Sequence, residues 1–132
     1  MVAHRIEGYA DLARAISDYK ESDSLFCTRL IGRTVQILGT LHHEDQIVRF
    51  YEPPPSTDDE RWDALIAGVA THTWSVAGNP GVPAWTKPFQ ALDDWWEPAP
   101  ISPKWTFWNM VHTPPSIRER KIIFPSQWLR AV

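Results

Sequence analysis

The amino-acid sequence predicts an all-α protein that forms one compact domain of five or six helices, joined by loops rich in proline and tryptophan. Apolar residues recur at helical spacing along most of the chain, whereas the strand-like runs are short. The length of 132 residues suits one hydrophobic core and is too short for two independent ones. Within this single domain (1–132), we expect an N-terminal helical part, 1–52, and a Trp/Pro-rich helical part, 53–132.

The first part is predicted to begin with two amphipathic helices. The first covers about 7–20, where apolar side chains form one stripe. The second follows a cap at Ser22 or Asp23 and stops near Gly39, a residue type that readily adopts a left-handed C-cap. The stretch 42–51 is ambiguous between a short helix and a strand, because its β-favouring residues occupy only the second half. We favour the helix.

The strongest helix signal follows the proline run 53–55, which ends whatever precedes it. Thr57 or Asp58 is expected to cap this helix, and the acidic residues beside them favour the positive end of the helix dipole. Apolar residues then recur at helical spacing from Trp62 until Gly78.

The rest of the chain predicts shorter elements. The segment 88–96 has room for only a short helix, because prolines flank it. Ser102 followed by Pro103 is a start signal for another helix, which would place Trp105 and Trp108 on its apolar face. Further short elements are expected as a helical turn at 116–120, a β-bridge at 121–124 and a terminal helical turn at 126–132.

Charge and cysteine content narrow the functional class. The formal net charge of -3 argues against general nucleic-acid binding. The single cysteine, Cys27, cannot form an intrachain disulfide, and no apolar run is long enough for a membrane span or a signal peptide. The sequence therefore predicts a cytoplasmic protein without a membrane contact.

No catalytic or metal-binding motif stands out. The His and acidic side chains of 42–45 are adjacent and do not converge on a helix, so a solvated turn is the favoured interpretation. His72 and His112 lack an accompanying nucleophile or spaced carboxylate, and Cys27 is expected to be a buried, inert thiol. We therefore expect no catalytic residue, no metal and no cofactor.

Tryptophan provides the first candidate surface. All eight tryptophans lie at or after Trp62, which is more aromatic area than a small core usually requires. Trp62, Trp105 and Trp108 are expected in the core. Trp95 and Trp96 are adjacent and cannot share one buried face, so one of them is expected at a partner interface. The tryptophans assigned to candidate partner binding are Trp85, Trp95 and Trp96.

A basic cluster near the C-terminus provides the second candidate surface. The last fifteen residues carry four Lys or Arg against one Glu, a net charge of +3. Arg118, Arg120 and Lys121 lie together in this segment. They form either a solvated turn or a patch that binds an anion or an acidic partner.

The second part of the chain also shows a family resemblance. The segment PPPSTDDERWDALIAGVATHTWSVAGNPGVPAWTKP, then WWEP and the ending SIRERKIIFPSQWLRAV, resembles a family of small, uncharacterised actinobacterial proteins. The resemblance covers roughly the last 80 residues. Similar proteins are often encoded beside a nucleotidyltransferase-like partner, in an arrangement like a toxin–antitoxin pair. The resemblance therefore implies an antitoxin role with a nucleotidyltransferase-like toxin as protein partner.

Together these features favour a non-enzymatic protein-binding module, most concretely an antitoxin-like protein that neutralises a partner toxin by direct contact. The alternative is a DNA-binding transcriptional regulator whose first two helices form a helix-turn-helix-like pair. The net acidic charge of residues 1–61 and the lack of a run of base-reading side chains in the second helix argue against that alternative.

Overall fold

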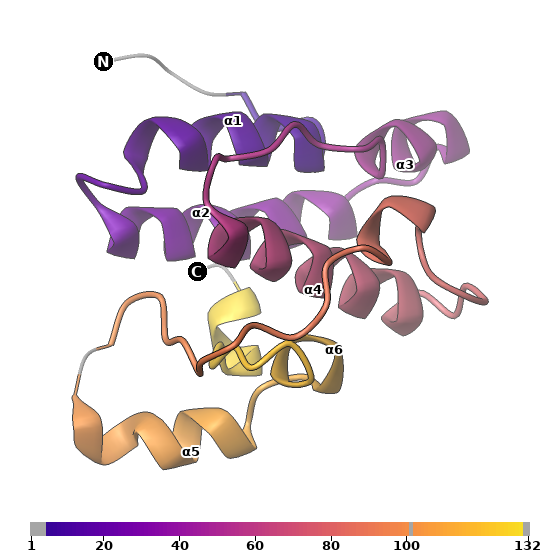
Figure 1. Ribbon diagram of the computed structural model, residues 1–132. Helices are drawn as coiled ribbons and strands as arrows, with labels where there is room; N and C mark the ends of the chain where they lie inside the picture. Colours follow the sequence, from indigo (N-terminus) through magenta and orange to yellow (C-terminus); the bar gives the residue numbers. More distant parts are fainter. Residues whose placement is uncertain (1–4, 101, 131–132) are drawn as a thin grey trace.

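The computed structural model describes residues 5–100 and 102–130, and these fold as an all-α protein, as predicted (Figure 1). Six α-helices and three short 3-10 turns form within them, and no β-sheet does. The α-helices are α1 (Tyr9–Tyr19), α2 (Ser24–Gly39), α3 (Glu44–Phe50), α4 (Glu60–Val76), α5 (Thr106–Val111) and α6 (Pro115–Arg118). The 3-10 turns are η1 (Ala84–Thr86), η2 (Pro103–Trp105) and η3 (Ser126–Leu129).

The helices α1 and α2 form an antiparallel hairpin, and α1 also packs against α4 (Figure 1). The carboxylate of Asp23 accepts the backbone N–H of Phe26 at 3.0 Å, so the predicted cap of α2 is confirmed. The left-handed C-cap predicted at Gly39 is wrong. Gly39 is the last residue of α2, and the right-handed Thr40 caps it through its N–H to the carbonyls of Ile37 and Leu38.

The central helix α4 is capped by Asp59 and not by Thr57 or Asp58. The Asp59 carboxylate accepts the backbone N–H of Arg61 at 2.9 Å. The Thr57 hydroxyl instead donates to Asp63 at 2.7 Å, and Asp58 takes a left-handed conformation with φ 64° that turns the chain into the helix. The cap of α4 therefore lies one residue after Asp58, the later of the two predicted positions.

Helix α4 contributes buried side chains to the core from Trp62 to Thr73. Trp62 is only 2% exposed, which confirms its predicted burial, and the apolar side chains around it continue along the helix. Gly68 allows α6 to approach closely, because an added Cβ would lie 3.1 Å from Ile117 Cγ1. The hydroxyl of Ser116 donates to the Gly68 carbonyl at 3.0 Å. This contact fixes the C-terminal segment on α4.

The short helix predicted at 88–96 is absent, and an extended segment replaces it. The Trp96 N–H donates to the Lys121 carbonyl at 3.0 Å, and the Ile123 N–H donates to the Trp96 carbonyl at 2.9 Å. These bonds form a parallel β-bridge between Trp96 and Ile122, so the bridge predicted at 121–124 is confirmed. Backbone groups that a helix would pair locally are paired with the C-terminal segment instead.

Four other predictions concern the short elements. The helix favoured within 42–51 is present as α3, and helical turns form at α6 and η3. Residues 131–132 of the last predicted turn lie outside the described residues. Pro103 opens η2, which leads into α5, although the Ser102 side chain makes no capping hydrogen bond.

A buried polar network ties the N-terminal hairpin to α4. The Thr73 hydroxyl donates to the Ala70 carbonyl at 3.1 Å, and the hydroxyls of Tyr9 and Tyr51 each lie 2.7 Å from its oxygen. A threonine oxygen has one proton and two lone pairs, so both tyrosines act as donors and the network is satisfied. None of the helices described has the length and apolarity needed to cross a bilayer.

Candidate functional site

The outer side of α5, which lies at the edge of the structure (Figure 1), exposes several apolar side chains. Phe107 is 74% exposed, Val111 51% and Trp108 39%. These three residues follow Lys104 at the spacing i+3, i+4 and i+7, the pattern of a single helix face. The apolar face of this amphipathic helix is therefore turned towards solvent.

The inner side of the same helix is polar. Glu97 accepts the Thr106 hydroxyl at 3.1 Å through one carboxylate oxygen and the Asn109 amide at 3.0 Å through the other. Asn109 is buried, and one turn later the Thr113 hydroxyl donates to its carbonyl at 2.7 Å. Thr113 also accepts the backbone N–H of Phe124 at 2.9 Å. Hydrogen bonds of Thr106, Asn109 and Thr113 therefore join the inner side of α5 to the rest of the protein.

Folding alone does not explain why α5 exposes its apolar side and turns its polar side inward. A surface helix normally buries its apolar stripe and exposes its polar one, because burial of apolar area is the main driving force of folding. Contiguous exposed apolar patches in soluble proteins mark interaction sites. We therefore take the exposed side chains of this region as the candidate site, and call them the α5 face: Trp105, Phe107, Trp108 and Val111.

The aromatic rings of the α5 face hold one another in place. Trp105 and Trp108 meet edge to face, with ring centroids 6.4 Å apart, and Trp108 stacks on His112 at 3.9 Å. The ammonium group of Lys104 lies 5.3 Å from the centre of the Trp105 ring. The face is thus partly preorganised, which lowers the entropy lost when a partner binds.

The surroundings of the α5 face are basic. The sequence 98–118 contains no Asp or Glu, and it carries Lys104, His112 and Arg118. The exposed Arg118 lies at the C-terminal end of α5, where its guanidinium donates to the Val111 carbonyl at 3.4 Å. On the inner side, both carboxylate oxygens of Glu97 accept hydrogen bonds from α5. A partner surface with acidic groups around an apolar groove would complement this face.

The structure separates the three tryptophans predicted at an interface. Trp95 is 47% exposed, whereas Trp96 packs edge to face on Trp62 at 5.0 Å. The adjacent rings diverge because the chain is extended there, so that successive side chains point to opposite sides. Trp85 is half-buried, and its indole N–H donates to the Tyr51 carbonyl at 2.8 Å. Of the three, Trp95 alone presents an exposed ring.

The predicted core positions of Trp105 and Trp108 are wrong, because both rings belong to the exposed α5 face. Their helical spacing predicted an apolar stripe correctly but not the side of the helix that turns inward. The stripe formed by Thr106, Asn109 and Thr113 at i, i+3 and i+7 is the signal that reveals the inversion.

The predicted basic cluster does not form a common patch. Arg120 is buried, and its guanidinium donates to the carbonyls of Phe89 at 2.9 Å and Thr86 at 3.4 Å and to that of Ser116. Burial lowers the pKa of Arg120, and its neighbour Glu119 opposes that shift. The side chain of Lys121 donates to the Asp93 carbonyl at 3.2 Å. Arg120 therefore positions the loop 86–89, and the interpretation of Arg120 as a surface residue is wrong.

The remaining titratable groups form no reactive arrangement in the part of the chain that the structure describes. Cys27 is buried, and desolvation raises the pKa of its thiol to about 11. Desolvation lowers the pKa of His72, which lies within α4. No group of three or more His, Cys, Asp or Glu side chains among the described residues could hold a metal ion.

The N-terminal hairpin does not resemble the pair of helices expected of a DNA-binding element. In a helix-turn-helix the second helix crosses the first at a steep angle, whereas α1 and α2 run antiparallel and side by side (Figure 1). Both helices also contribute to the common core, through residues such as Leu12 and Ile31. No family model, curated protein or solved structure matches the chain.

Proposed function

We propose that this chain is a non-enzymatic protein-binding module that acts as an antitoxin-like protein, and that the α5 face is its contact surface. The observation that carries the proposal is the inverted polarity of α5, which exposes Phe107, Trp108 and Val111 and keeps its polar residues inside. Aromatic side chains at the centre of an interface provide much of the binding free energy.

The shape of the site favours one mode of recognition. The exposed side chains follow a helix face, as in amphipathic helices that insert into an apolar groove of a partner. Lys104 and Arg118 flank this face, and no acidic residue lies between them in the sequence. The proposed occupant is therefore a protein with an apolar groove and an acidic rim. The family resemblance favours a nucleotidyltransferase-like toxin for that role.

Val111 and Val48 provide a matched pair of substitutions. Val111 is 51% exposed at the end of α5, and Val48 is 65% exposed near the end of α3. Each variant, Val111→Asp or Val48→Asp, places a carboxylate on an exposed helix surface. We expect Val111→Asp to weaken binding to the co-expressed product of the neighbouring gene at least about tenfold, because a charge enters an apolar contact beside an acidic rim.

The measurement is affinity pull-down followed by calorimetric titration of the purified pair, with thermal melting of both variants. Val48→Asp is expected to bind like the unmodified protein. Equal binding by the two variants would place the contact elsewhere, with the exposed Trp95 as the next surface to test.

A further inference from the structure

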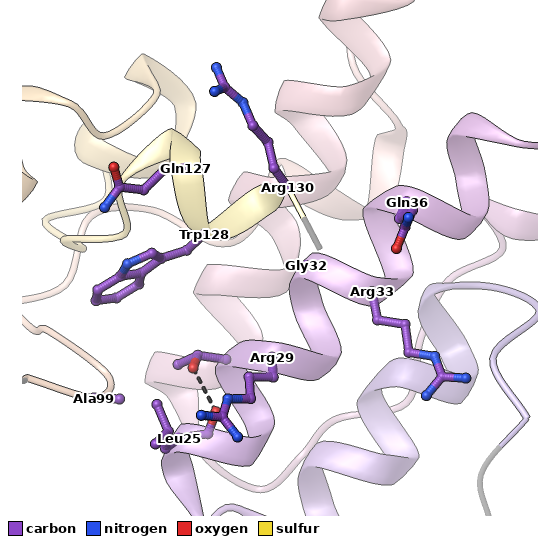
Figure 2. Close-up of a pocket in the computed structure, with 10 residues that line it drawn as sticks. Leu25, Arg29, Gly32, Arg33, Gln36, Ala99, Gln127, Trp128 and Arg130 are labelled. Carbon is purple, nitrogen blue, oxygen red and sulfur yellow. Dashed lines mark hydrogen bonds between the residues drawn. The ribbon is translucent and has the colours of Figure 1, made fainter. Parts of the chain in front are cut away.

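An open groove of about 730 Å³ lies between α2, η3 and the chain near Ala99 (Figure 2). Pockets of about 300–1,000 Å³ are typical of ligand sites. The side chains that give this groove its chemistry come from α2 and from the C-terminal turn: Arg29, Arg33, Gln36, Gln127, Trp128 and Arg130.

The groove has an uncompensated positive charge. No Asp or Glu lines it, and α2 contains no acidic residue from Ser24 to Gly39. Within residues 5–100 and 102–130, none of Arg29, Arg33 and Arg130 forms an ion pair. Arg29 and Arg33 are four residues apart on α2, a spacing at which like charges destabilise a helix. An anionic ligand would relieve this repulsion.

The arginines are spread around the groove and do not converge. In Figure 2 the guanidinium groups of Arg29, Arg33 and Arg130 point in three different directions. Such a spread does not suit one compact anion, which needs donors directed to a single point. It suits an extended chain that carries several separated negative charges.

One wall of the groove is aromatic. The indole of Trp128 extends into the space towards Leu25 and Ala99 (Figure 2), and it packs edge to face on the buried Phe124 at 5.2 Å. This contact fixes the ring, while its N–H has no hydrogen-bond partner in the described part of the chain. A fixed aromatic ring beside arginines is the arrangement on which unpaired nucleic-acid bases stack.

We propose that this groove binds single-stranded nucleic acid. The arginines contact successive phosphates, Trp128 stacks on one base, and the amides of Gln36 and Gln127 offer hydrogen bonds to base edges. The aromatic wall favours a single strand over a duplex, whose bases are already stacked on one another. It also favours a nucleic acid over an acidic peptide, which has carboxylates but no base to stack. The site is separate from the α5 face.

The test is fluorescence anisotropy of a labelled 12-mer of deoxythymidine and a labelled 12-mer of uridine with the purified protein, between 25 and 200 mM KCl. Three phosphate contacts predict that log K falls against log salt with a slope of about -2, at about 0.7 per contact. The double variant Arg29→Ala/Arg33→Ala should reduce that slope by about 1.4. The control Arg49→Ala removes an exposed arginine of α3 outside the groove and should leave the slope unchanged.

Trp128 variants and competitors complete the test. Trp128→Phe keeps a stacking ring and should retain most of the affinity, whereas Trp128→Leu should lose about tenfold, with circular dichroism as the folding control. Polyglutamate of equal charge should compete poorly. The proposal is overturned by absence of binding at 25 mM KCl, by equal loss in Arg49→Ala, or by equal binding of the Phe and Leu variants. Displacement by polyglutamate would assign the groove to an acidic protein segment and also overturn it.

Discussion

Gly68→Ala tests the close packing of α6 on α4. The new Cβ would lie 3.1 Å from Ile117 Cγ1, 3.2 Å from Ile117 Cα and 3.3 Å from the Ser116 carbonyl oxygen. Two of these atoms belong to the backbone, so α6 must shift. Overpacking of this kind costs about 1–3 kcal/mol, and the shift also weakens the Ser116 hydrogen bond, at about 1 kcal/mol. Replacement of a mid-helix glycine by alanine returns about 1 kcal/mol.

The expected net result is a loss of about 1–3 kcal/mol in the free energy of unfolding, seen as a fall of about 3–9 °C in Tm for a chain of this size. Gly39→Ala is the control, because Gly39 also lies within a helix and its added Cβ meets nothing within 4 Å. That variant should be unchanged or slightly more stable. Urea unfolding of both variants measures the difference, and equal stability would refute the close contact between α4 and α6.

Three further predictions concern buried or half-buried polar groups. Thr73→Val leaves the hydroxyls of Tyr9 and Tyr51 without their shared acceptor and should cost about 2–4 kcal/mol in urea unfolding. Arg120→Lys keeps the charge but loses the planar fork that reaches three carbonyls, so Tm should fall by several degrees in thermal melting. Burial lowers the pKa of His72 in the folded state, so as pH falls the imidazole is protonated in the unfolded state at a higher pH than in the folded state. Stability should therefore decline as pH falls below about 6.5, and His72→Gln should flatten this decline in melts from pH 5 to 8.

The helices of the N-terminal half could be predicted because their signals are local. Apolar periodicity and the Asp23 cap define α1 and α2 without reference to distant residues. The segment 88–96 could not be predicted in this way, since its backbone pairs with residues 25–28 positions later in the chain. Its extended form depends on tertiary contacts that the local sequence does not contain.

The candidate surfaces show the same limit of local patterns. The periodicity of α5 is identical whether its aromatic side faces the core or the solvent. Its orientation is fixed by Glu97, which lies nine residues before Thr106, the nearest residue that it binds. Arg120 was expected at the surface as part of a basic cluster with Arg118 and Lys121, because charged side chains usually lie there. Its burial depends on carbonyl groups of Thr86, Phe89 and Ser116, which only the folded chain brings together.

The attachment of α5 through Glu97 has a consequence for how this protein can evolve. Residues that hold a helix in place and residues that meet a partner usually share the same apolar side, so a change in binding specificity also threatens stability. In this protein Thr106 and Asn109 hold α5 in place through Glu97, while Phe107 and Val111 point away from the fold. The outward positions are therefore free to diversify, with little effect on the stability of the scaffold.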